Sequence, residues 1–235
     1  MTLEPAARAL SAPARSALWS IALAVVAGAT LVLSLWAAAW PVLPGDVASA
    51  RWLQMHPFPF GRELAHAINM LGYAPGAISL TVVFAGLLVW RGHPRLAAVI
   101  LGTLPLRLLP SALKAIVDSP RPTPDIVEVL ESPADPGFPS GHAFGAVLVF
   151  GLLWWLAPRL ARSQLASRAL RALALCLILA TGYSRVLVGA HWPSDVLGGY
   201  LWGLLVLLPL LRVAARLETG AGEETGTEDG NARTR

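Results

Sequence analysis

The sequence predicts an all-α integral membrane protein, a six-transmembrane-helix bundle with short interfacial helices. Two observations lead to this fold class. The 235 residues are 55% hydrophobic and only 14% charged, whereas about a quarter of the residues of a soluble domain are charged. Apolar segments also follow one another along the chain, and we expect helices in them because lipid cannot satisfy open backbone groups.

Six apolar segments approach the length of about 20 residues that a helix needs to cross the hydrocarbon core. They are Ala17–Trp40, Pro75–Trp90, Leu96–Ala115, His142–Leu156, Ala169–Tyr183 and Val196–Leu211. The second, fourth and fifth are short enough to be core helices of a soluble protein, but six in succession favour a membrane bundle. The first is longer than the apolar core of a signal peptide, so we expect an uncleaved span.

Two short mixed stretches lie between the first and second spans, around Val47–Met55 and Arg62–Leu71, and Pro57 and Pro59 separate them. Each stretch combines apolar side chains with charged ones. We predict two short helices at the outer membrane interface, and an ordinary surface loop is the alternative.

The chain divides into three parts. Residues 1–16 form a cytoplasmic N-terminal segment, residues 17–216 form the six-span domain, and residues 217–235 form a tail. From Glu218 onward the tail is rich in Gly, Glu and Thr and has no apolar periodicity. Such a composition cannot form a packed core, so we predict a disordered cytoplasmic end.

Arginine placement predicts the orientation of the bundle. All basic residues except Lys114 are arginines. With six spans, one side of the membrane receives Arg8, Arg15, Arg91, Arg95, Arg159, Arg162, Arg168, Arg171, Arg212 and Arg216. The positive-inside rule makes that side cytoplasmic. We therefore expect both termini in the cytoplasm and the protein in the plasma (inner) membrane.

Nucleic-acid binding and cysteine chemistry are excluded. The arginines form no basic stripe with interleaved aromatic residues, so we do not expect nucleic acid as a partner. Cys176 is the only cysteine, so neither a disulfide within the chain nor a cysteine metal site can form. The sequence contains no pattern that specifies an oligomeric state.

Polar residues that are costly at membrane depth gather at three places, all on the predicted outer face. Lys114 and Arg121 lie at the outer end of the third span, and Arg185 follows the fifth. Three converging cations favour a multiply charged anion such as phosphate. Ser140 and Gly141, where the fourth span begins, add a hydroxyl donor and a close backbone approach at a helix N-terminus.

The other polar residues of these clusters can supply a nucleophile and an acid. His191 and Asp195 are four residues apart and share a face if the segment is helical. An aspartate that accepts from one ring nitrogen leaves the other nitrogen unprotonated and nucleophilic. His142 arrives on another span and can protonate a departing alkoxide. Two histidines and an aspartate also resemble a zinc site, but the three cations would repel a divalent ion, so we expect no metal and no cofactor.

These residues resemble the three-part signature of the type 2 phosphatidic acid phosphatase (lipid phosphate phosphatase) superfamily. Its pattern is lysine, six residues and Arg-Pro, then Pro-Ser-Gly-His, then Ser-Arg, five residues, histidine, three residues and aspartate. This chain fills every position in the segments Lys114–Pro122, Pro139–His142 and Ser184–Asp195. Three pieces in this order and spacing are far more specific than one tetrapeptide.

The resemblance implies a role for each residue. His191 attacks phosphorus, Asp195 orients its ring, and His142 protonates the leaving group. The remaining signature residues hold the phosphoryl oxygens: Lys114, Arg121, Ser140, Gly141 and Arg185. The resemblance also implies that the reaction needs no metal.

The implied activity is hydrolysis of a lipid phosphomonoester or pyrophosphate through a phosphohistidine intermediate. The candidate substrates are phosphatidic acid, phosphatidylglycerol phosphate and polyprenyl phosphates or pyrophosphates, and membrane lipids surround the site. One alternative is a phosphotransferase that passes the phosphoryl group to a lipid hydroxyl, which a new phospholipid product would reveal. Another is a protein that only binds or transports a phosphate lipid, and it would keep its function after His191→Ala.

Two features lie outside the signature. Arg107 lies seven residues before Lys114, deeper on nearly the same helical face. It either extends the positive field toward the lipid or forms a buried structural pair. The loop Asp125–Asp135 is acidic, with Asp125, Glu128, Glu131 and Asp135. It either discourages non-productive anions or is a solvated loop, and we expect the solvated loop.

Overall fold

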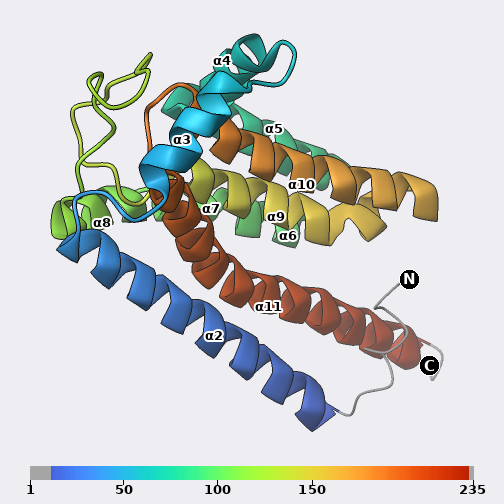
Figure 1. Ribbon diagram of the computed structural model, residues 1–235. Helices are drawn as coiled ribbons and strands as arrows, with labels where there is room; N and C mark the ends of the chain where they lie inside the picture. The colour runs from blue at the N-terminus through green and yellow to red at the C-terminus, as the bar shows by residue number, and fades with distance from the viewer. Residues whose placement is uncertain (1–11, 233–235) are drawn as a thin grey trace.

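The computed structural model describes residues 12–232. The regular elements among these residues are all helices, and none is a β-strand. In chain order the helices are α2 (Ala12–Ala39), α3 (Asp46–Met55), α4 (Gly61–Gly72), α5 (Ala74–Trp90), α6 (Pro94–Leu101), α7 (Thr103–Leu106), α8 (Leu109–Val117), α9 (Gly141–Leu160), α10 (Gln164–Leu187) and α11 (Pro193–Ala232). The irregular segment between α8 and α9, which we call the 118–140 loop, rises from one end of the bundle (Figure 1). The predicted all-α class is confirmed.

Five helical stretches are long and apolar enough to cross a membrane: Ser16–Ala39, Pro94–Val117, Gly141–Leu160, Gln164–Leu187 and Pro193–Leu217. The second predicted span corresponds to α5, which has 17 residues. It reaches the required length only together with α4, and the two helices are bent by 71° relative to each other. The described chain is therefore an integral membrane protein with five spans, or six if α4 and α5 form one broken span.

The third predicted span is interrupted twice and consists of α6, α7 and α8. Gly102 ends α6. Pro105 has no N–H for the helical ladder, and Pro110 in the first turn of α8 favours a new helix start. The predicted span is found over Pro94–Val117, with two breaks that the sequence analysis did not predict. The second break leaves Arg107 between α7 and α8.

α9 lies inside the bundle and packs against both α10 and α11. Phe144, Leu148, Leu152 and Leu156 recur every four residues along α9 and are fully buried, so they share one face. That face forms a common apolar core with α5, α6 and α11. α2 packs along α11 instead and leaves large apolar side chains exposed, as expected for a helix that faces lipid.

Arginine and tryptophan side chains lie at the end of the bundle away from the 118–140 loop. The Cζ atom of Arg159, in the last turn of α9, lies 3.9 Å from the ring centroid of Trp155. Arg91, in the turn between α5 and α6, donates to the Leu160 carbonyl at 3.3 Å. Two of the arginine-rich connections therefore share one end, as the arginine pattern predicted, while the side of the membrane that they face stays a prediction.

α3 and α4 confirm the two short helices that we predicted between the first two spans, and the surface-loop alternative is wrong. Both lie at the end of the bundle that carries the 118–140 loop (Figure 1). Gln54 of α3 donates to the Glu128 carbonyl at 2.8 Å. Arg62 of α4 binds both carboxylate oxygens of Glu128, at 2.7 and 2.8 Å. The two helices therefore hold the loop over the end of the bundle.

The structure describes α11 as far as Ala232, and the disordered end from Glu218 onward stays a prediction. Most of the predicted N-terminal segment 1–16 and the last residues of the tail lie outside the described residues.

Candidate active site

The three signature segments meet at the end of the bundle that carries the 118–140 loop. Lys114 lies in the last turn of α8, Ser140 caps the N-terminus of α9, and Arg185 lies in the last turn of α10. His191 lies in the connection to α11, and Asp195 lies in the first turn of α11. The Ser140 N–H donates to the Asp195 carbonyl at 2.9 Å and joins the starts of α9 and α11.

His191 and Asp195 form a buried pair. Nδ1 of His191 lies 3.3 Å from Oδ2 of Asp195, and the two side chains are only 3% and 1% exposed. The same oxygen accepts a hydrogen bond of 3.0 Å from the Trp192 N–H. Gly137 comes so close that a Cβ at this position would lie 2.8 Å from Oδ2. The surroundings therefore hold the carboxylate in one orientation toward the imidazole.

The ring of His191 is neutral at physiological pH. Burial lowers its pKa most, and the charges of Arg121, Arg185 and Lys114 lower it further, so that the pKa lies well below the usual 6.5. Nη1 of Arg121 lies 3.1 Å from Nε2 of His191. A guanidinium group can only donate, so Nε2 must accept, and the single ring proton lies on Nδ1, which faces Asp195.

A carboxylate of the 118–140 loop lies between two of the cations. Lys114 Nζ donates to Oδ2 of Asp135 at 2.6 Å, and Arg121 Nη2 donates to Oδ1 at 2.8 Å. Burial acts to raise the pKa of Asp135, but the hydrogen bond and charge of Lys114 and the charge of Arg121 outweigh it and lower the pKa. Asp135 is therefore ionised, and its two oxygens bridge Lys114 and Arg121. Two oxygens of a phosphoryl group could bridge the same two cations.

A second loop carboxylate pairs with the third cation. Arg185, whose side chain is 1% exposed, donates through Nη1 to Glu131 at 2.8 Å. Tyr73 and Asn69 donate to the same carboxylate at 2.9 and 3.1 Å. Burial acts to raise the pKa of Glu131, but the charge of Arg185 and these hydrogen bonds lower it overall. Nε of Arg185 is buried and, within residues 12–232, has no hydrogen-bond partner, so one donor of this guanidinium is available to a ligand.

His142 lies in the first turn of α9. Its ring packs edge to face against Tyr73, with the centroids 5.2 Å apart. Its Nε2 atom is buried and finds no hydrogen-bond partner in the part of the chain that the structure describes, which is costly for a polar atom. The start of α9 also presents first-turn N–H groups, which favour anions. The arrangement can therefore bind a tetrahedral anion between the neutral ring of His191 and the ring of His142, whose Nε2 has no partner.

A family model of the PAP2 superfamily matches residues 95–218, which is more than half of the chain. The chain belongs to the PAP2 superfamily. Phosphatidylglycerophosphatase B of Bacillus subtilis (strain 168) is 30% identical over 152 residues, which are 63% of this PAP2 chain and 72% of that protein. The crystal structure of the first transmembrane PAP2 type phosphatidylglycerolphosphate phosphatase from Bacillus subtilis superposes with a TM-score of 0.67 and 25% identity, covering 80% of this chain and 95% of that one.

The predicted family is therefore confirmed, and this PAP2 protein is a membrane phosphatase that hydrolyses phosphoric esters. The structure brings the predicted site residues to one place, while the role of each residue stays a prediction. Among residues 12–232, no group of three or more His, Cys, Asp or Glu side chains is arranged to hold a metal ion. The absence of a metal from the reaction likewise stays a prediction.

One residue that supports the PAP2 site was not predicted from sequence. Asp46, at the start of α3, is buried. It accepts from the Ser194 N–H at 2.9 Å and from the Ser194 hydroxyl at 2.6 Å. These bonds fix the first turn of α11, which carries Asp195. No motif marks Asp46, and we had assigned its segment to the membrane interface.

Three of the four acidic residues of the loop are exposed, as expected for a solvated loop, but three of the four also form ion pairs. Only Asp125, of the four acidic residues, stays exposed without an ion pair in the described chain. The ion pairs of the loop are Glu128–Arg62, Glu131–Arg185, Asp135–Lys114 and Asp135–Arg121. We had assigned the cations of the PAP2 site to the substrate alone. A buried charge without a partner is costly, so the chain supplies counter-ions of its own.

Proposed function

We propose that this protein removes the terminal phosphate of phosphatidylglycerol phosphate through a phosphohistidine on His191. The observation that carries the proposal is the unprotonated Nε2 of this buried ring, which lies 3.1 Å from Arg121 beside two further cations. The choice of lipid is supported by the two Bacillus subtilis relatives, since both are named as phosphatases of this lipid.

Substrate binding begins with an exchange of anions. The phosphomonoester replaces the Asp135 carboxylate between Lys114 and Arg121, where each cation keeps a charge-assisted hydrogen bond to an oxygen. Arg185 adds a bond through its unpartnered Nε while Nη1 stays on Glu131. The N–H groups at the start of α9 hold the remaining oxygen.

In the first chemical step, Nε2 of His191 attacks phosphorus. A P–N bond forms, and the P–O bond to the glycerol oxygen breaks. Asp195 accepts the Nδ1 proton in a hydrogen bond and stabilises the positive charge that develops on the ring. His142, which is protonated once the phosphate dianion is bound beside it, donates its proton to the departing oxygen and becomes neutral.

In the second step, neutral His142 takes a proton from a water molecule whose oxygen attacks phosphorus. The P–N bond breaks, and its electron pair returns to Nε2 of His191. One ester and one water thereby give one alcohol and one inorganic phosphate, and both histidines recover their starting states. No step requires a metal ion.

The site is expected to face the extracytoplasmic side of the plasma (inner) membrane. The arginine-bearing connections, such as that around Arg159, lie at the other end of the bundle, and the positive-inside rule assigns that end to the cytoplasm. Both termini are then cytoplasmic, and the lipid substrate comes from the outer leaflet.

The test is phosphate release by the purified protein in detergent with a chelator present. We expect release from phosphatidylglycerol phosphate in a panel that also contains phosphatidic acid and a polyprenyl pyrophosphate. His191→Ala should reduce kcat by about 10³-fold or more, whereas His56→Ala, at an exposed position directly after α3, should have no effect. Substrate labelled in its terminal phosphate should leave base-stable label on the wild type and none on His191→Ala.

Each part of the proposal can fail separately. Folded protein that releases no phosphate from any lipid would overturn the hydrolase activity on lipids. A new phospholipid in place of free phosphate would indicate the phosphotransferase. Loss of activity with chelator would contradict the metal-free mechanism.

A further inference from the structure

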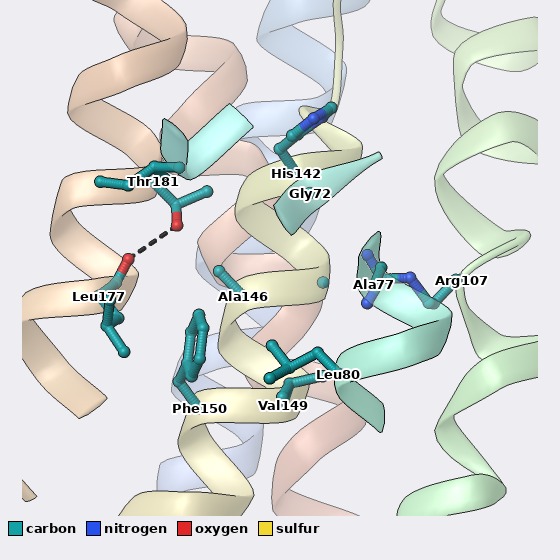
Figure 2. A pocket seen from close by; sticks show the side chains of 12 residues that line it. Gly72, Ala77, Leu80, Arg107, His142, Ala146, Val149, Phe150, Leu177 and Thr181 are labelled. Atoms are coloured by element: carbon teal, nitrogen blue, oxygen red, sulfur yellow. Dashed lines mark hydrogen bonds between the residues drawn. The ribbon is translucent and has the colours of Figure 1, made fainter. Parts of the chain in front are cut away.

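A pocket lies directly beside His142, between α9, α10 and the bent pair α4–α5 (Figure 2). Away from His142 the wall of the pocket is apolar. Val149 and Phe150 of α9 and Leu80 of α5 line it there. Thr181, a polar residue of the lining, already donates to the Leu177 carbonyl at 2.7 Å. The lining is therefore mostly apolar, apart from two other polar groups that face the pocket.

The two polar groups are His142 and Arg107. Nε2 of His142 is buried without a partner. Arg107 is only partly exposed, and its guanidinium lies against α9 at Gly145, where a Cβ would come within 2.6 to 2.8 Å of the guanidinium atoms. No carboxylate or carbonyl of the described residues pairs with this guanidinium. The buried structural pair, one of our two interpretations of Arg107, is therefore not found.

An unpaired guanidinium at membrane depth is costly and rarely accidental. Arginine stays protonated in proteins, so this cost is not relieved by loss of a proton. The absence of a side chain at Gly145 leaves room for the group beside α9. The remaining way to compensate the charge is an anion that enters the pocket.

The position of Arg107 relative to His142 indicates which anion this is. Under the proposed function His142 touches the leaving oxygen, so the rest of the lipid must continue into this pocket. Gly145, which Arg107 contacts, follows His142 by three residues, about 4.5 Å along the helix axis and on the same face. An anion bound to Arg107 would therefore lie farther along α9 than the leaving oxygen at His142. The apolar wall of the pocket begins on the far side of Arg107.

We infer that this pocket binds the leaving-group half of the lipid and that Arg107 binds a phosphodiester in it. This inference rests on the proposed function and specifies its substrate class. Phosphatidylglycerol phosphate has such a phosphodiester, separated from the reacting phosphate by a glycerol unit, and its acyl chains follow. Phosphatidic acid has no second anion. A lipid pyrophosphate has its second phosphorus directly after the bridging oxygen, too close to His142 to suit Arg107.

The experiment compares Arg107→Gln with the wild type on phosphatidylglycerol phosphate and phosphatidic acid with identical acyl chains. The kcat/KM on phosphatidylglycerol phosphate should fall about 10- to 100-fold, the loss expected for one charged hydrogen-bonding partner. The kcat/KM on phosphatidic acid should change less than about twofold, which also shows that the variant is folded. Arg107→Lys should keep an intermediate preference, and Arg91→Gln, at the opposite end of the bundle, should behave as wild type.

A second readout uses the product. Phosphatidylglycerol, which keeps the phosphodiester, should inhibit hydrolysis of phosphatidic acid by the wild type and inhibit Arg107→Gln more weakly. Equal losses of kcat/KM on both lipids would overturn the inference, since a structural role predicts them. A larger loss on a lipid pyrophosphate than on phosphatidylglycerol phosphate would overturn the assignment to a phosphodiester. If the wild type hydrolyses neither phospholipid, the proposed function fails and this inference fails with it.

Discussion

The cations that we propose as phosphate ligands also favour the unprotonated ring of His191. Lys114, Arg121 and Arg185 all lower the pKa of this ring, in addition to the larger effect of burial. A proton on the ring would add a further positive charge beside these three cations and would be repelled. Nε2 therefore keeps its lone pair as long as the three cations surround it. In the proposed reaction, Asp195 then stabilises the charge that the ring of His191 acquires.

This pKa predicts that folding stability depends on pH through His191. An unfolded histidine titrates near pH ~6.5, whereas the folded ring has a pKa well below this value. As the pH falls below about 6.5, the unfolded chain binds a proton at this position and the folded chain does not, so stability is lost on the acid side. We expect the unfolding temperature in detergent to fall less steeply between about pH 7 and pH 5 in His191→Gln than in the wild type.

The exposed residue His56 provides the control for this measurement. His56→Gln should keep the slope of the wild type. Identical slopes in His191→Gln and the wild type would show that the ring does not have a lowered pKa.

Among the elements, the 118–140 loop has two kinds of attachment. Near its middle, Glu128 is bound by Arg62 and Gln54, which belong to α4 and α3. Near its end, Asp135 reaches the cations of the site with a side chain that is 53% exposed. Glu131, between them, is only 20% exposed and is held by several donors. The Asp135 side chain is therefore the part of this contact that can leave, while the backbone carbonyls of Asp135 and Pro136 accept from Arg121 and Lys114 at 2.6 and 2.7 Å.

Removal of the Asp135 charge should strengthen the binding of competing anions. In Asp135→Asn the amide no longer competes fully with phosphate for Lys114 and Arg121. We expect the inhibition constants of inorganic phosphate and vanadate to fall roughly 3- to 10-fold, a modest effect because the carboxylate is half exposed. Asp125→Asn, in the same loop but without a cation partner, is the matched control. Unchanged inhibition constants in Asp135→Asn would mean that the phosphate does not replace this carboxylate.

For the whole molecule, much of the fold and most of the site were predictable from sequence. The lengths of the apolar segments predicted the membrane helices because crossing a bilayer imposes a minimum length on each. Lys114 and His142 lie at the ends of predicted helices and His191 lies between two of them. Helices in one bundle bring such ends together, so the sequence predicted that these residues would meet. These predictions succeed because a physical constraint, such as the minimum length of a membrane helix, leaves a pattern within a short stretch of sequence.

The rest depends on contacts between segments that no local pattern describes. Asp46 is an ordinary acidic residue in the sequence, and only packing of α3 against α11 makes it a support of the site. The pairing of Glu131 with Arg185 crosses from an irregular loop to α10. The unpaired state of Arg107 is visible only when all its neighbours are in place. The breaks in the third span were signalled by Gly102 and Pro105, but the hydropathy of the segment masked them.

The proposed orientation of the whole molecule can be tested with single cysteines. In a Cys176→Ser background, Asp125→Cys lies in the 118–140 loop and Ser163→Cys lies between α9 and α10. We expect a membrane-impermeant maleimide to label the first variant in intact cells and the second only after permeabilisation. The reverse pattern would place the site in the cytoplasm.

The hydrogen bond between Ser140 N–H and the Asp195 carbonyl has a consequence for how such enzymes diversify. It ties the start of α9, which carries the proposed acid His142, to the start of α11, which carries Asp195, so these two groups belong to one unit of the inner bundle. The parts that cover this unit, α3, α4 and the 118–140 loop, come from other stretches of the chain. We therefore expect substitutions in that cover to change which lipid headgroup is accepted, while the proposed reacting groups beneath it keep their arrangement.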